Sequence, residues 1–330
     1  MDFVEVVREK ARDRPRRIVF PEGEEERTLE AVAEIQRREL LFPVLLGDPD
    51  TVAEGLERKG GDPLGMEVVD PRSLEGTKPY VEALLERRRT RGMTPAEART
   101  HVREPLMRGA LMVRLGEVDG SVAGAVHSTG DVLRAAIWCV GPASGIRTVS
   151  SAFYMVTPPF RSASAEVLTF TDCAVVPDPN AEQLAHIASA AARARRKVVG
   201  DSPVVAFLSY STQGSAGGAS VEKVRDAVRI FHDMEPGIPA DGELQVDVAL
   251  SQEVARRKVR HSQVTGDANV LVFPDLDAGN IGYKLAQRLA GAQALGPIVQ
   301  GLDRPCNDLS RGASPKDIVD VACVTSLMAP

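Results

Sequence analysis

A short segment near the C-terminus combines a hydroxyl, a guanidinium and a carboxylate within eight residues. Ser310 and Arg311 stand first, and Ser314 and Asp317 follow. If Ser314 caps a helix, Asp317 occupies the third helical position, where a carboxylate complements the helix dipole. The same carboxylate could act as a general base beside a bound anion, for example for a thiol, whose reference pKa is about 8.5. The spacing leaves both interpretations open.

A second polar turn has the residues of an anion site. Ser128, Thr129 and Gly130 follow an apolar run, and Arg134 comes a few residues later. A glycine lets the backbone approach a ligand, hydroxyls can donate hydrogen bonds, and an arginine can bind a phosphate or thioester oxygen through two donors. A helix N-cap followed by a surface arginine would leave the same pattern, so this alternative also stays open.

The third turn, residues 209–218, is a Gly/Ser loop that contains Ser211 and Thr212. It follows an expected strand and precedes an expected helix, as a phosphate-binding turn would. No Gly-Lys-Ser/Thr follows, so this is not a Walker A loop and ATP hydrolysis is not supported. A flexible connection is the alternative interpretation.

The sequence contains no recognisable metal-binding pattern. The five histidines include no pair at metal-ligand or catalytic-triad spacing, and His127 is interpreted as a polar wall of the site. Asp275 and Asp277 share a turn, but two acids alone are weak support for a cation, so helix capping or lining of a ligand is favoured. The four cysteines match no zinc pattern and are predicted to be reduced core thiols, which fits the cytoplasm: Cys139, Cys173, Cys306 and Cys323.

Short apolar runs alternate with amphipathic segments along the chain. Strands are expected over residues 17–20, 42–46, 121–126, 167–170, 174–176, 204–208 and 270–273. Helices are expected over residues 28–38, 221–232 and 281–289, from 132 onward, and after the capping residues Thr94, Asn180 and Ser314. This alternation is typical of α/β domains with largely parallel sheets. Ligands of such sheets lie beyond the carboxyl ends of the strands, where the three polar turns are expected.

The composition indicates the class of protein. The chain has 330 residues, 43% hydrophobic and 26% charged, which is typical of a globular protein and long enough for two domains. With 40 basic and 46 acidic residues and a net charge of −6, it lacks the positive footprint of a nucleic-acid binder. The sequence has no apolar stretch of about 18 residues and no apolar segment at its N-terminus, so neither a membrane span nor a signal peptide is predicted.

Five blocks that occur in order between about residues 115 and 319 resemble the phosphate acetyltransferase and phosphate butyryltransferase family. They are LGEVDGSVAGAVHSTGDVLRAA, VAFLSYSTQGSA, DGELQVDVAL, ANVLVFPDLDAGNIGYKLAQRLAGAQALGPIVQGL and NDLSRGASPKDIV, and IVFPEGEEERTLEA near the N-terminus is also similar. Three segments depart from the family pattern: LRAAI replaces the frequent LRPA, TPPFRSASA at residues 157–165 has no counterpart, and DCA at residues 172–174 replaces a small polar pattern. These departures leave the acyl-chain preference open.

The resemblance implies an α/β fold of two domains with a cleft between them, similar to isocitrate and isopropylmalate dehydrogenases. The last helices of the family return to the first domain. Domain I is therefore expected over residues 1–147 with 299–330, and domain II over residues 148–298. Members of the family usually form homodimers, so a homodimer is expected here.

The resemblance also implies a reaction. Acetyl members of the family convert acetyl-CoA and inorganic phosphate reversibly into acetyl phosphate and coenzyme A, with no metal and no permanently bound cofactor. Asp317 matches the base for the CoA thiol, Ser310 the group that stabilises the tetrahedral intermediate, and Arg311 an arginine that binds acetyl phosphate. Arg134 matches a second arginine of the cleft, and Arg88 matches an arginine linked to CoA binding, although the alignment within residues 87–89 could slip by one.

Three alternatives remain. The first is a transferase that prefers butyryl groups. The second is a non-catalytic sensor of acyl phosphate or acyl-CoA, against which the joint presence of Ser310, Arg311 and Asp317 argues. The third is a dehydrogenase on a similar fold, although no G-x-G-x-x-G turn follows the first expected strand.

Overall fold

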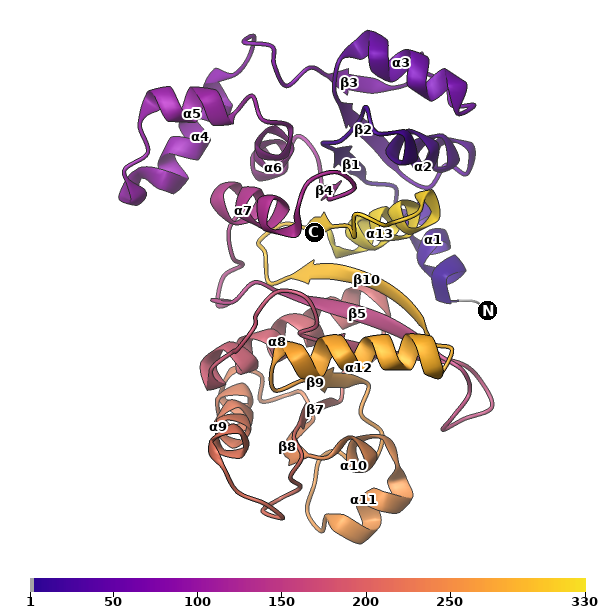
Figure 1. Ribbon diagram of the computed structural model, residues 1–330, viewed down its shortest axis with the longest axis vertical. Helices are drawn as coiled ribbons and strands as arrows, with labels where there is room; N and C mark the ends of the chain where they lie inside the picture. The colour runs from indigo at the N-terminus through magenta and orange to yellow at the C-terminus, as the bar shows by residue number, and fades with distance from the viewer. Residues whose placement is uncertain (1–2) are drawn as a thin grey trace. The chain divides into compact units, whose positions relative to one another are not determined.

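The computed structural model describes residues 3–330. The chain divides into two compact units: unit 1 comprises Met1–Ala143 and Leu302–Pro330, and unit 2 comprises Ser144–Gly301 (Figure 1). The chain thus leaves unit 1, forms unit 2 and returns. That the two units are the predicted domains I and II, with boundaries after residue 147 and before residue 299, stays a prediction.

The sheet of unit 1 is parallel, in the order β11-β4-β1-β2-β3. Its strands are β1 (Arg17–Phe20), β2 (Phe42–Leu46), β3 (Glu67–Val69), β4 (Gly120–Ala123) and β11 (Cys306–Asp308). The strands predicted over 17–20 and 42–46 are confirmed. Strand β1 lies between β2 and β4, so the chain crosses over in both directions from it, and such positions are where ligands of α/β sheets bind.

Helices enclose this sheet. They are α1 (Phe3–Asp13), α2 (Glu26–Arg37), α3 (Pro49–Arg58), α4 (Lys78–Arg88), η1 (Arg89–Arg91), α5 (Pro95–His101), α6 (Pro105–Leu115), α7 (Thr129–Cys139) and α13 (Pro315–Met328). Helix α13 packs against α1, α2 and β4, whereas α6 packs against α4, α7 and β4. Successive residues Ile18, Val19 and Phe20 of β1 are all buried, as expected for a parallel strand that helices cover on both faces.

Strand β4 ends three residues earlier than predicted. It was expected over 121–126 but stops at Ala123. Gly124 has a φ of +113°, a conformation that favours glycine. The N–H groups of Gly124 and Val126 donate to the carboxylate of Glu22 instead of to a neighbouring strand. A side chain distant in sequence therefore ends the strand.

The sheet of unit 2 has the order β10-β5-β6-β9-β7-β8. Its strands are β5 (Ser150–Thr157), β6 (Glu166–Thr171), β7 (Val205–Leu208), β8 (Ala240–Leu244), β9 (Val270–Val272) and β10 (Gln293–Gln300). Strand β5 is antiparallel to both β6 and β10, and the other pairs are parallel. Strands β5 and β10 were not predicted. The predicted strand 174–176 is wrong, because the N–H groups of all three residues donate to the carboxylate of Asp172.

The helices of unit 2 are α8 (Ala181–Val198), α9 (Ala219–Met234), α10 (Val246–Leu250), α11 (Gln252–Lys258) and α12 (Leu276–Leu289). The predicted cap Asn180 forms a capping box with Gln183. Asp275 caps α12 through the N–H of Ala278, so that helix begins earlier than the predicted residue 281 and the capping interpretation of this acid is confirmed. Within the described part of the chain, none of the helices combines the length and apolar character needed to cross a membrane.

Candidate active site

The turns that follow β4 and β11 lie side by side at the carboxyl edge of the unit 1 sheet. The two strands are parallel neighbours, with Ala123 opposite Asp308. The hydroxyl of Thr129 donates to Oδ2 of Asp308 at 2.7 Å and joins the turns directly. Two of the three predicted polar turns, at Ser128 and at Ser310, are thus brought together by the sheet.

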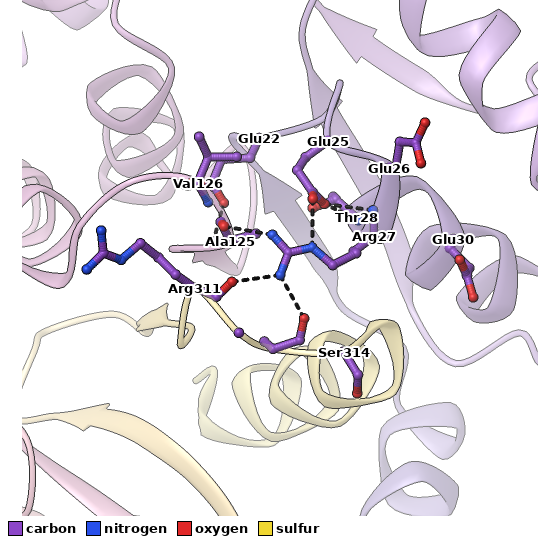
Figure 2. Close-up of polar contacts among 12 residues, drawn as sticks. Glu22, Glu25, Glu26, Arg27, Thr28, Glu30, Ala125, Val126, Arg311 and Ser314 are labelled. Carbon is purple, nitrogen blue, oxygen red and sulfur yellow. Dashed lines mark hydrogen bonds and ion pairs between the residues drawn. The ribbon is translucent and has the colours of Figure 1, made fainter.

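The turn after β1 reaches the same place through Glu22. The carboxylate of this buried residue accepts hydrogen bonds from the N–H groups of Ala125 at 2.7 Å and His127 at 2.8 Å, and from His127 Nδ1 at 2.7 Å. Burial alone would raise the pKa of Glu22, but these hydrogen bonds outweigh burial and hold its pKa below the usual value. Glu22 therefore stays ionised and shapes the β4–α7 turn (Figure 2).

Ser310 and Arg311 form an exposed turn before α13. The carbonyl of Ser310 accepts from the N–H of Ala313 at 2.8 Å, and its hydroxyl accepts from the N–H of Gly312 at 3.3 Å. In Figure 2 the side chain of Arg311 extends away from the Arg27 guanidinium, while its carbonyl faces it. The hydroxyl of Ser310 and the guanidinium of Arg311 are therefore presented to solvent by one short turn.

Asp317 stands at the third position of α13, as predicted, with Ser314 as the cap. Its Oδ2 accepts hydrogen bonds from the N–H of Ser314 at 2.9 Å and from the hydroxyl of Ser314 at 2.7 Å. The predicted cap Ser314 and the third helical position of Asp317 are thus confirmed. The capping uses one carboxylate oxygen of an exposed side chain, so the role of Asp317 as a base stays a separate prediction.

Asp308 is a residue of this site that was not predicted from the sequence. Its side chain is 2% exposed, and among residues 3–330 its Oδ1 has no hydrogen-bond partner. Burial raises the pKa of Asp308 to about 6, although the hydrogen bond from Thr129 opposes this shift. The only available signal was an acid between a buried strand and Ser310, which the sequence also offers at many turns.

The β4–α7 turn is held by its own side chains. Ser128 caps α7: its hydroxyl accepts from the N–H of Asp131 at 3.3 Å and donates to the Asp131 carboxylate at 2.6 Å. Arg134 is exposed and ion-paired with Asp131, and both line a cavity of about 330 Å³ together with His127. The hydroxyls of Ser128 and Thr129, predicted to donate to a ligand, donate to carboxylates in this structure.

Arg88 lies at the other end of α7. Its guanidinium carbon is 4.2 Å from the centre of the Trp138 ring, which also contacts the ring of His101 edge-on at 5.5 Å. Trp138 follows Thr129 by nine residues, a rise of about 13 Å along a helix. The guanidinium of Arg88 is therefore stacked on a residue of α7 that lies about 13 Å along the helix from Thr129.

The third predicted turn belongs to unit 2 and surrounds a carboxylate of the protein itself. The hydroxyl of buried Ser211 donates to Glu243 at 2.8 Å, the N–H of Gly214 donates to it at 2.9 Å, and Arg225 pairs with it at 2.8 Å. Burial alone would raise the pKa of Glu243, but these donors lower it to about 2. Thr212 accepts from the N–H of Gln245 at 3.0 Å. The Ser211 hydroxyl, expected to bind phosphate, thus binds Glu243, which the sequence pattern did not reveal.

Comparison with known proteins identifies the family of this chain. A model of the family described as phosphate acetyl/butaryl transferase matches residues 2–326. The phosphate acetyltransferase of Thermoanaerobacterium thermosaccharolyticum is 45% identical over 329 residues and covers 100% of both chains. The phosphate acetyltransferase of Clostridium acetobutylicum is 44% identical over 329 residues, which are 100% of this chain and 99% of that protein.

Comparison with solved structures also finds phosphotransacetylases. A phosphotransacetylase from Streptococcus pyogenes has a TM-score of 0.92 and 39% identity over 98% of this chain and 97% of that one. The EutD phosphotransacetylase from Staphylococcus aureus has a TM-score of 0.90 and 37% identity over 100% and 98%. A 4-hydroxythreonine-4-phosphate dehydrogenase from Burkholderia phymatum, 13% identical with a TM-score of 0.54 over 96% and 98%, shares the fold alone. On the family match and the end-to-end identity to its members, the chain belongs to the phosphate acetyl/butaryl transferase family.

Proposed function

We propose that this protein is a phosphate acetyltransferase, which moves an acetyl group reversibly between coenzyme A and inorganic phosphate. The observation that carries the proposal is the adjacency of the Ser310–Asp317 turn and the Ser128–Arg134 turn at one sheet edge, in a chain 45% identical to a phosphate acetyltransferase along its full length. Coenzyme A and phosphate are substrates in this reaction, and no permanently bound cofactor is part of it.

The reaction follows from the groups on the two turns. Asp317 takes the proton from the CoA thiol, and we assign this proton to Oδ1 because both capping hydrogen bonds end on Oδ2. The thiolate sulfur then attacks the carbonyl carbon of acetyl phosphate, and Ser310 donates a hydrogen bond to the oxyanion that forms. The bond from carbon to the phosphate oxygen breaks, and phosphate leaves with its charge offset by Arg311 and Arg134. In the reverse direction phosphate attacks acetyl-CoA and Asp317 returns the proton.

Substrate binding involves further groups of the predicted set. Because Ser128 and Thr129 donate their hydroxyl hydrogens to carboxylates, the first backbone N–H groups of α7 are the donors we assign to an anionic substrate. Arg88, stacked on Trp138, is assigned to coenzyme A. Ser211 and Thr212 also stay assigned to substrate binding, with Glu243 as the internal competitor for the Ser211 hydroxyl.

The proposal includes a homodimer in the cytoplasm. Helix α12 exposes three apolar side chains at a spacing of four residues, Ile281, Leu285 and Leu289, with exposed fractions of 56%, 52% and 82%. Such a stripe on one helix face favours a protein partner, and a second copy of the chain is the partner that we assign. The four cysteines are buried and unpaired, as expected in a reducing compartment.

Replacement of Asp317 by asparagine tests the reaction. The purified protein is assayed with acetyl phosphate and coenzyme A by following loss of free thiol. We expect transfer by the unmodified protein and a loss of about 10²–10⁴-fold in kcat for Asp317→Asn, because a general base contributes that much. Butyryl phosphate in parallel compares the two acyl groups.

The matched control is Glu97→Gln. Glu97 occupies the same third helical position in α5 and accepts from the N–H and hydroxyl of Thr94, both at 2.8 Å, as Asp317 does from Ser314. This variant makes the same change from carboxylate to amide in a capping box of the same kind and is expected to keep its activity. Near-normal turnover by Asp317→Asn would remove Asp317 from its role, and no thiol consumption by the unmodified protein would reject the function.

A further inference from the structure

We infer that Arg27 is a positioning residue, whose guanidinium holds the turn that carries Ser310 and Arg311 against the β4–α7 turn. The inference rests on the proposed function, which assigns Ser310 and Arg311 to the reacting groups. Arg27 acts through the backbone of these turns and is assigned no contact with a substrate.

The Arg27 guanidinium lies between the two turns and donates to both of them (Figure 2). Its Nη1 donates to the carbonyl oxygens of Arg311 at 2.8 Å and Ala313 at 2.9 Å. Its Nη2 donates to the carbonyl oxygen of Ala125 at 2.8 Å. One planar side chain thus connects the segment before α13 with the segment after β4, although the two are far apart in the sequence.

The start of α2 sets the direction of this guanidinium. Glu25 caps the helix by accepting from the N–H groups of Arg27 at 2.7 Å and Thr28 at 3.0 Å. The other oxygen of the same carboxylate accepts from Arg27 Nε at 2.7 Å. The side chain is therefore fixed to the helix terminus by its own neighbour before it reaches either turn.

Glu22 and Arg27 have complementary roles in the β1–α2 segment. Glu22 accepts from the N–H groups of the β4–α7 turn, whereas Arg27 donates to the carbonyl of Ala125 in that same turn. Two hydrogen bonds within the 310–313 turn end on Ser310, and Arg27 adds two from outside. We expect a turn with so few internal bonds to depend on that support for its conformation.

The chemistry of arginine suits this role, and lysine cannot replace it. Four separate hydrogen bonds leave the guanidinium in one plane, towards Glu25, Ala125, Arg311 and Ala313. A lysine carries its donors on a single nitrogen and cannot face both turns at once. Holding the carbonyl of Arg311 leaves the side chain of that residue on the opposite side, where Figure 2 shows it.

The test compares Arg27→Ala and Arg27→Lys with Arg17→Ala in the full-length protein. Arg17 is a matched control: it begins β1 at the amino edge of the same sheet and links the carbonyl of Glu117, at 3.0 Å, to the carboxylate of Glu67, at 2.7 Å. Acetyl transfer is measured well below the unfolding temperature of every variant. We expect a loss of about 100-fold in kcat for Arg27→Ala and a smaller loss for Arg27→Lys, since a displacement of about 1 Å has effects of that size.

A double-mutant cycle separates positioning from general stability. If Arg27 acts through the Arg311 turn, Arg27→Ala costs much less in the Arg311→Ala background than alone, whereas an independent structural effect is the same in both. The KM for coenzyme A is expected to change little, because the turn is assigned to the acyl phosphate. Equal losses in the two backgrounds, or wild-type kcat and KM in Arg27→Ala, overturn the inference.

Hydrogen exchange gives a readout that does not need the activity. Amides of residues 310–313 and 124–127 are expected to exchange faster in Arg27→Ala than in the unmodified protein, and to stay unchanged in Arg17→Ala. Unchanged exchange in both turns rejects the positioning role even if the protein transfers no acetyl group. An inactive unmodified protein with faster exchange in Arg27→Ala rejects the proposed function and leaves the positioning of the turn intact.

Discussion

At the level of single side chains, the site contains acids in opposite environments. Glu22 is buried but surrounded by N–H donors, so its pKa is lowered. Asp308 is buried beside one hydroxyl donor, Thr129, and the nearby charge of Glu22 adds to the effect of burial, so its pKa is raised to about 6. The number of donors that meet each carboxylate therefore decides in which direction its pKa departs from the usual value.

The raised pKa of Asp308 predicts a pH-dependent stability. The folded protein holds this proton more tightly than the unfolded chain, whose aspartate has a pKa near 3.8. Stability contributed by Asp308 is therefore present below about pH 4 and is lost as the pH rises to about 6, by about 3 kcal/mol. Urea unfolding of the unmodified protein and of Asp308→Asn at pH 4.5 and 7.5 measures this. The variant is expected to be the more stable at pH 7.5, and an identical change with pH in both proteins would contradict the assignment.

At the level of helices, strands and turns, carboxylates replace strand neighbours and ligands. Glu22 ends β4, Asp172 prevents a strand over 174–176, and Glu243 fills the turn around Ser211. In each case a local pattern assigns backbone N–H groups to a strand or to a phosphate. In the structure these groups donate hydrogen bonds to a carboxylate of the protein itself. Buried donors need an acceptor, and an ionised carboxylate is a strong one.

The turn of unit 2 is therefore expected to depend on Glu243. Glu243→Gln removes the charge that Arg225, Ser211 and Gly214 share, and we expect a loss of about 1.5–3 kcal/mol in the free energy of unfolding, because hydrogen bonds to a buried charge are weakened while Arg225 stays partly exposed. Glu222→Gln is the matched control, because Glu222 also pairs with Arg225, at 2.6 Å, but is exposed. That variant is expected to lose less than about 1 kcal/mol. Similar small losses in urea unfolding of both variants would show that the turn does not need the buried charge.

At the level of the complete chain, the apolar stripe of α12 formed by Ile281, Leu285 and Leu289 is exposed and is not part of the core of unit 2. We expect a dimer by light scattering after size exclusion, and a monomer for Leu285→Glu, because a charge at the centre of an apolar contact is costly to bury. Leu64→Glu is the control, since Leu64 lies in unit 1 and is 97% exposed. A dimeric Leu285→Glu would exclude this stripe as the interface, and a monomeric unmodified protein would make the homodimer prediction wrong.

The features that could be predicted have their partners close in the sequence. The capping boxes at Thr94, Asn180 and Ser314 each join residues three positions apart, and β1 and β2 are short apolar runs. The position of Asp317 in its helix follows from the same local rule. Five blocks in order between about residues 115 and 319 were sufficient to indicate the family.

The features that could not be predicted join distant residues. Asp308 acquires its raised pKa from burial in the folded sheet, and Arg27 meets Arg311 only because β1, β4 and β11 lie side by side. Likewise, Glu22 accepts a hydrogen bond from the N–H of Gly124, which lies 102 positions away in the sequence. Sequence spacing describes only neighbours within a few residues, whereas the environment of a buried charge depends on every segment packed around it. The motifs of the family were therefore readable from the chain, but the contacts that hold the two turns in place arose from the packing of its sheets.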